Sequence, residues 1–260
     1  MTINFLSNLR LSMQRNSTLS WILINTLGYY IVNINYLGQY LQKTPIHANF
    51  IGLVFILVIS PVVSGFIFGL IQLGYMKIMN REIFIGRWVL LTSFSFFLIN
   101  LINAYLYGFL NLAIFKTTGI DIPVTGNIFS GFVISGEMDL FIKILIGACW
   151  GISLGLVSGL VLGVFPSFSI LNKEIKKEWI RRVLVALCLS FVINSIFYTI
   201  AYDIHLLGGR LGSLYHIGIL FTGIMYGVST RNAIKKLLAS GSIPIAEENV
   251  TLAGNPSNAH

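Results

Sequence analysis

The residues that could carry chemistry in this chain are few, and their spacing forms no recognised site. The four histidines are His47, His205, His216 and His260, and no two of them have the H-x-x-x-H spacing that presents two metal ligands on one helix face. No phosphate-binding loop of the form G-x-x-x-x-G-K-[ST] occurs either. We therefore predict no catalytic, metal-binding or cofactor-binding residue, and we favour a role other than catalysis.

Asparagines are the polar residues that could act inside the apolar segments. Those that we single out are Asn33, Asn100, Asn103 and Asn194. An amide without a partner is costly in hydrocarbon, so these side chains should face other helices or a water-filled cavity. Two interpretations remain open: the amides form hydrogen bonds between helices, or they line a path for a polar substrate. No charged residue lies near the middle of an apolar segment, which argues against proton-coupled transport.

The elements that carry these residues are six apolar segments, each long enough to cross a bilayer as a helix. Only 10% of the 260 residues are charged, against about 25% in soluble proteins. This composition predicts an all-α, six-helix transmembrane bundle in residues 19–239. A cytoplasmic N-terminal segment (1–18) precedes it, and a disordered cytoplasmic tail (240–260) follows it. The predicted spans are about 19–41, 50–78, 88–115, 140–170, 182–202 and 212–230.

The basic residues are sorted by loop, and this sorting predicts the orientation in the membrane. Cytoplasmic loops carry an excess of Lys and Arg, so we expect both termini in the cytoplasm, in agreement with an even number of spans. The membrane would be a bacterial inner membrane or an internal membrane such as a thylakoid. Because the charge is explained in this way, the net value of +8 indicates no nucleic-acid partner. Thirteen of the 17 basic residues lie on the predicted inner side: Arg10, Arg15, Lys77, Arg81, Arg87, Lys173, Lys176, Lys177, Arg181, Arg182, Arg231, Lys235 and Lys236.

A pattern of two helices occurs three times along the chain. In each copy, Trp is followed by Asn after twelve or fifteen residues, and a second segment then carries small residues four positions apart. This spacing lets helix backbones approach closely, within the chain or in self-association. It predicts three parallel two-helix repeats about an axis along the membrane normal. The Trp and Asn residues are Trp21 with Asn33, Trp88 with Asn100 and Trp179 with Asn194. The glycines are Gly65, Gly69, Gly147, Gly151, Gly155, Gly159, Gly223 and Gly227.

Two further features concern the ends of the predicted spans. Trp88 and Trp179 lie near such ends, where Trp is typical of the membrane interface. Residues 117–139 form the longest connection, and connections of this length are often functional. We expect this loop either to dip into the outer interface, or to lie across the bundle as a lid, or to be a flexible connector.

One stretch of the chain resembles a known class of sequences. Gly65-x3-Gly69-x2-Gln72, followed by a basic loop and then Trp88-Val-Leu-Leu-Thr92, is similar to a glycine-rich pattern of uncharacterised polytopic membrane proteins common in cyanobacteria. The resemblance covers about residues 65–100, with weaker echoes near 147–165 and 218–230, and it departs from the pattern after Thr92. It implies a multi-pass membrane protein of unassigned role, and it assigns no role to individual residues.

The missing catalytic motifs and the glycine spacing lead to an expectation about function. We expect a non-enzymatic accessory, assembly or scaffold component that packs against lipid, against a membrane-protein partner or against a second copy of itself. The alternative is a transporter or channel for a small neutral or amphipathic solute, with the asparagines lining its path. No motif in the chain identifies a substrate, a partner or a cofactor.

Overall fold

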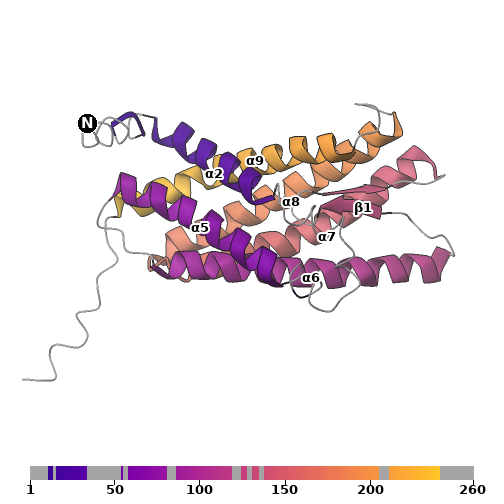
Figure 1. Cartoon of the computed structure of the whole chain (residues 1–260), viewed down its shortest axis with the longest axis horizontal. Coiled ribbons are helices and arrows are strands. Elements are labelled where there is room, and N and C mark those ends of the chain that lie inside the picture. The colour runs from indigo at the N-terminus through magenta and orange to yellow at the C-terminus, as the bar shows by residue number, and fades with distance from the viewer. Residues whose placement is uncertain are drawn as a thin grey trace, which may run out of the picture.

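The computed structural model confirms the predicted helical class. Six long helices carry most of the described residues: α2 (Ser17–Asn33), α5 (Ser60–Met79), α6 (Gly86–Thr118), α7 (Leu140–Ser167), α8 (Lys173–Asp203) and α9 (Leu211–Ala239). They lie alongside one another in an elongated bundle (Figure 1). The predicted N-terminal segment 1–18 is described only in part, and the predicted tail lies outside the described residues beyond residue 240. The structure describes residues 11–13, 16–33, 54, 58–80, 86–118, 124–127, 131–134, 138–204 and 211–240.

Four of the described helices are long and apolar enough to cross a membrane, which fits a membrane protein. Large apolar side chains also cover the outside of the bundle, as on Leu90 (65% exposed) and Leu160 (48% exposed). Such a surface is unfavourable in water and suits hydrocarbon. The predicted spans 19–41 and 212–230 fall on α2 and α9, outside this set of four. The four candidate spans are Ser60–Met79, Arg87–Leu106, Leu140–Ser167 and Lys173–Asp203.

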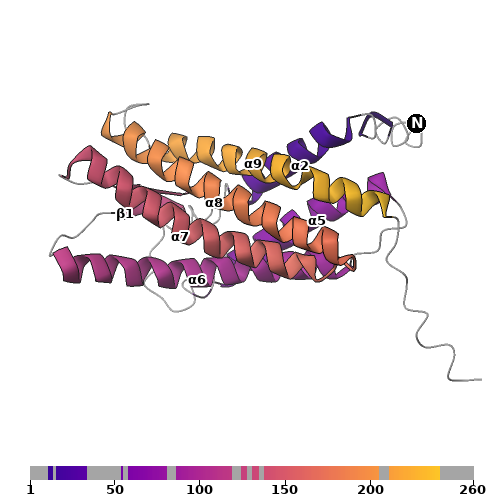
Figure 2. The same cartoon turned by 180° about the vertical axis from the view of Figure 1, so that it is seen from behind.

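The helices contact one another in chain order, and the order closes on itself. Each of the helices from α2 to α9 packs against the next one in the sequence, and α9 also packs against α2. The front and back views both place α2 beside α9 (Figures 1 and 2). At one end of the bundle, the Tyr75 hydroxyl donates to the Ser17 carbonyl at 2.8 Å, and Asn80 Nδ2 donates to the Leu238 carbonyl at 3.2 Å. The start of α2 and the end of α9 therefore lie at the same end.

The opposite end carries a small feature that the all-α expectation left out. Strands β1 (Val124–Asn127) and β2 (Gly131–Ile134) form an antiparallel hairpin within the predicted long connection. The backbone N–H of Ile134 donates to Thr199 Oγ1 on α8 at 3.3 Å, and the Ile134 side chain is fully buried. Nearby, Lys143 Nζ on α7 binds Asp203 Oδ1 on α8 at 2.5 Å. The described part of the connection is thus held against α7 and α8, as a covering loop would be.

The start of one helix differs from its predicted span for a local chemical reason, whereas the second predicted span, 50–78, is helical wherever it is described. Ile59, just before α5, already has helical dihedral angles, and Pro61 stands in the first turn of α5. Proline suits this position because the first turn of a helix needs no backbone N–H. Helix α8 begins nine residues earlier than predicted, because the Asn172 side chain accepts bonds from the N–H groups of Glu174 and Ile175. The basic residues before position 182 therefore lie on a helix.

Candidate functional site

The glycines of α5 lie where this helix approaches α6 most closely. A Cβ atom on Gly65 would be 2.7 Å from the Cα atom of Ser93, and one on Gly69 would be 2.9 Å from the Cα atom of Val89. Contacts this short leave no room for a side chain, because the neighbouring atoms belong to the backbone. The two glycines thus set the distance between α5 and α6.

The glycines of α7 and α9 meet neighbouring helices in the same way. A Cβ atom on Gly151, Gly155 or Gly159 would come within 2.7 Å of a Cα atom of α8, and one on Gly223 or Gly227 would be 2.8 Å from a Cα atom of α2. Gly147 is looser, since its nearest neighbour is Thr199 Oγ1 at 3.5 Å. The structure therefore uses the α7 stripe for packing within one chain. The backbone partners are Val192, Cys188, Leu184, Thr26 and Ile22, in that order.

The glycines of the three close helix pairs face the same positions of the partner helix, when these positions are numbered from its tryptophan, and so share one register. In each pair, two glycines four residues apart face the residues one and five positions after a Trp. Gly163, with a virtual Cβ 3.3 Å from the Ile180 Cα atom, completes this set on α7. The pairs that meet through these glycines are α5 with α6, α7 with α8, and α9 with α2. Each of these glycine helices also packs against the helix before it, but without such a glycine contact in this register. The facing residues are Gly69 with Val89, Gly65 with Ser93, Gly163 with Ile180, Gly159 with Leu184, Gly227 with Ile22 and Gly223 with Thr26.

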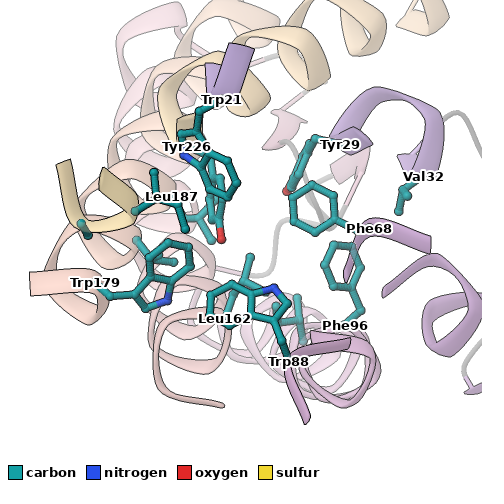
Figure 3. Packing of buried hydrophobic residues seen from close by; sticks show 14 of the residues in the cluster. Trp21, Tyr29, Val32, Phe68, Trp88, Phe96, Leu162, Trp179, Leu187 and Tyr226 are labelled. Atoms are coloured by element: carbon teal, nitrogen blue, oxygen red, sulfur yellow. The ribbon is translucent and has the colours of Figure 1, made fainter. Parts of the chain in front are cut away.

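The tryptophans of these pairs pack together inside the bundle, near the ends where α2, α6 and α8 begin. Trp21, Trp88 and Trp179 are all fully buried, so Trp88 and Trp179 contact other side chains of the protein and not lipid headgroups as in an aromatic belt. The large indole ring suits either environment, and burial of its apolar surface stabilises the core. Figure 3 shows the three rings among other aromatic side chains that come from several helices and point toward one another. The rings of Trp88 and Trp179 meet edge to face, with centroids 5.0 Å apart.

Two of the three indole N–H groups have an acceptor at the same relative position. Trp88 Nε1 donates to Gln72 Oε1 at 2.9 Å, and Trp21 Nε1 donates to Thr230 Oγ1 at 3.0 Å. Each acceptor stands three residues after the second glycine of its pair. In the third pair this position is Pro166, whose side chain accepts no bond, and Trp179 Nε1 has no hydrogen-bond partner among the described residues.

Gln72 joins the first pair to another helix. Besides accepting from the indole, its Nε2 atom donates to Asn25 Oδ1 on α2 at 2.8 Å. Asn25 in turn donates to the Trp21 carbonyl of its own helix at 2.8 Å. Gln72 and Asn25 are both buried, with 1% and 0% of their surface exposed. The sequence signal for this role was the place of Gln72 three residues after Gly69, which the resemblance includes without assigning it a function.

The predicted intramembrane asparagines are all buried inside the protein. Asn194 Nδ2 on α8 donates to Thr222 Oγ1 on α9 at 3.0 Å, and Asn103 Nδ2 on α6 donates to Ser158 Oγ on α7 at 3.0 Å. Both amides stand fifteen residues after a Trp, and both acceptors directly precede a glycine of the shared register. Asn103, and not Asn100, therefore corresponds to Asn194. Asn33, Asn100, Asn103 and Asn194 are 8%, 6%, 0% and 2% exposed, and Asn33 donates within its own helix to the Tyr29 carbonyl.

The described residues do not assemble a catalytic or metal-binding group. They contain no cluster of three His, Cys, Asp or Glu residues that could hold a metal ion. Of the four histidines only His216 lies in the described part, where its ring is 5.8 Å from that of Tyr30. Residues 151–155 do match the hydrolase pattern G-x-S-x-G, but that pattern acts on a strand-to-helix turn. Here Ser153 lies within α7, and its hydroxyl donates to the Cys149 carbonyl at 2.9 Å.

Leucine substitutions should rank the glycines by their distance from the neighbouring backbone. Gly155→Leu should lower the free energy of unfolding by about 1–3 kcal/mol, because its Cβ would lie 2.6 Å from the Cys188 Cα atom. Gly163→Leu should cost less, since that distance is 3.3 Å. Gly74→Leu is the control, because nothing lies within 4 Å of its virtual Cβ. Thermal unfolding in mild detergent measures the order, and equal midpoints for all three would contradict the assignment.

A hydroxyl at position 166 should supply the acceptor that Trp179 lacks. Pro166→Thr and Pro166→Val both restore a backbone N–H and have nearly the same shape, but only Thr offers an oxygen to the indole. The Thr variant should exceed the Val variant in unfolding free energy by about 0.5–1.5 kcal/mol, the usual contribution of a buried hydrogen bond. Melting temperatures of the two purified variants test this, and a Val variant of equal or greater stability would refute the correspondence with Thr230.

Comparison with other proteins adds nothing to this geometry. The chain matches no protein-family model, no curated protein and no solved structure. The resemblance to glycine-rich cyanobacterial membrane proteins therefore stays a prediction. The described residues show three kinds of contact. Glycines of α5, α7 and α9 form close backbone contacts with α6, α8 and α2, here called the glycine seams; buried aromatic side chains pack together; and amides form hydrogen bonds from one helix to another.

Proposed function

We propose that the protein is a non-enzymatic membrane component, an accessory, assembly or scaffold protein that packs against lipid or a partner. The observation that carries this proposal is the use of the buried amides. Gln72 with Asn25, Asn103 with Ser158, and Asn194 with Thr222 each join two different helices through a hydrogen bond. Polar groups that form hydrogen bonds between neighbouring helices make the bundle rigid. A path for a solute needs polar groups that can exchange these bonds for bonds to the solute.

The proposed architecture is a ring of six spans made of three related helix pairs. The shared register of the glycines and tryptophans supports three two-helix repeats, α2 with α5, α6 with α7 and α8 with α9, related by an axis along the membrane normal, and each glycine contact joins two different repeats. In this arrangement α9 and α2 form the third close pair, although they stand at opposite ends of the chain. The contact of Gly223 and Gly227 with α2 gives the first helix the place that α6 and α8 have in the other two pairs.

Aromatic rings inside the bundle favour the scaffold over the alternative, a transporter or channel for a small neutral or amphipathic solute. Five rings from α5, α6, α8 and α9 form a continuous chain of four contacts, with centroids 5.0–6.1 Å apart. A solute on the axis would have to separate rings that are almost entirely buried. Along this chain the rings are Phe96, Phe68, Tyr226, Trp179 and Trp88, and its two end rings, Phe96 and Trp88, belong to the same helix, α6.

The orientation with both termini in the cytoplasm is part of the proposal and has its own test. In a chain with Cys149 and Cys188 replaced by Ala, single cysteines at Lys173 and Lys235 should react with an impermeant thiol reagent only after the cells are opened. Cysteines at Asp139 and Ile204 should react in intact cells, because these residues lie at the other end of the bundle. The reverse pattern would show that the orientation inferred from the basic residues is inverted.

Solute flux separates the scaffold from the transporter. In proteoliposomes, the scaffold should produce no faster shrinkage or recovery in glycerol or urea gradients than empty vesicles do. Asn194→Leu should lower the unfolding free energy by about 0.5–1.5 kcal/mol, as loss of an interhelical bond in a membrane does. Ile193→Leu is the control on the same helix, since Ile193 is 44% exposed on the outside. Flux that the native protein supports, and that Asn194→Leu abolishes without unfolding, would overturn the proposal.

A further inference from the structure

A groove runs along the first turns of α8, and the helix contacts described above do not fill it. Its volume is about 820 Å³, within the range of ~300–1,000 Å³ of small-molecule sites. Ile180 and Leu184 line its apolar part, and these are the residues whose Cα atoms meet the glycines of α7. In the described part of the chain the remaining lining residues are Lys173, Glu174, Lys176, Lys177, Glu178 and Arg181.

The charges of this groove are unbalanced toward the positive. Four of its lining residues are cations, and two are carboxylates. The Glu178 carboxylate is already compensated, because Lys236 Nζ lies 2.6 Å from one oxygen and Arg182 Nε lies 3.8 Å from the other. Lys173, Lys177 and Arg181 are exposed, and no ion pair between described residues includes them. An anion entering the groove therefore finds several cations and only one uncompensated carboxylate, that of Glu174.

We infer that the groove binds one anionic phospholipid of the adjacent leaflet. The inference rests on the membrane placement in the proposed function. Basic groups at the end of a spanning helix suit a phosphate headgroup, and the apolar residues one to two turns further along suit the start of an acyl chain. Lys173, Lys177 and Arg181 stand at successive helical turns, and Leu184 continues the same face. A soluble acidic ligand would use the cations but would gain nothing from the apolar floor.

The test compares the binding of two lipids that differ only in headgroup charge. The protein in mild detergent is mixed with equal amounts of phosphatidylglycerol and phosphatidylcholine with the same acyl chains, and bound lipid is counted by native mass spectrometry. The native chain should retain one phosphatidylglycerol in preference to phosphatidylcholine. The triple variant Lys173→Gln, Lys177→Gln, Arg181→Gln should lose this preference by about tenfold or more, since each basic residue near a lipid phosphate contributes to binding.

A second triple variant serves as the matched control. Arg87→Gln, Arg231→Gln, Lys235→Gln removes the same charge from exposed positions at the same end of the bundle but outside the groove. It should keep the preference for phosphatidylglycerol. Equal losses in both triple variants would mean general surface attraction, and displacement of the lipid by millimolar glycerol phosphate would mean a site for a soluble phosphate ester. Either result would overturn the inference. The solute-flux and cysteine-labelling experiments test the proposed function independently of lipid binding. A negative result in the lipid experiment therefore does not contradict the proposed function.

Discussion

The close approach of helix backbones at the glycine seams is the constraint on which the rest of the structure depends. When two helices touch through Cα atoms, a shift along the seam by one residue would bring a side chain into the place of a glycine. The register is therefore fixed, and so is the position of each Trp relative to the residue three places after the second glycine. The packing of the buried aromatic rings and the indole hydrogen bonds are consequences of this register. The same logic places Asn103 and Asn194 opposite the hydroxyl residues that precede a glycine.

Sequence patterns predicted the long helices and the glycines of the close contacts, but not which helix each of these residues would contact. Apolar length located the helices, and the four-residue spacing of glycines located the close contacts. A glycine helix has two neighbours along the chain, however, and nothing in its own residues says which one its stripe faces. Spacing from Trp suggested Asn100, whereas the bonding partner identifies Asn103. The burial of Trp88 and Trp179 was missed because an indole suits an interface and a core equally well.

The three helix pairs share a backbone arrangement but differ in their polar chemistry. Glutamine, threonine and proline occupy the position beside the three indoles, and Gln72 alone among them extends a further bond to α2. Trp179 Nε1 has no partner among the described residues, and a buried N–H of this kind is unfavourable by about 1–3 kcal/mol, so other contacts have to stabilise the pair of α7 and α8. It has the longest glycine stripe of the three, and the ion pair of Lys143 with Asp203 joins its far end.

The contact between α2 and α9 has a consequence for biosynthesis. A chain made from its N-terminus releases α2 before the other five long helices and α9 after them, so the backbone surface of α2 that Gly223 and Gly227 finally cover stays without its partner until α9 has been made. The other two seams join consecutive helices and can close as soon as each pair is complete. Folding would thus occur in two steps: neighbouring helices pair during synthesis, and α9 packs against α2 afterwards. The second step would limit the folding rate, because its contacts are the most distant in sequence.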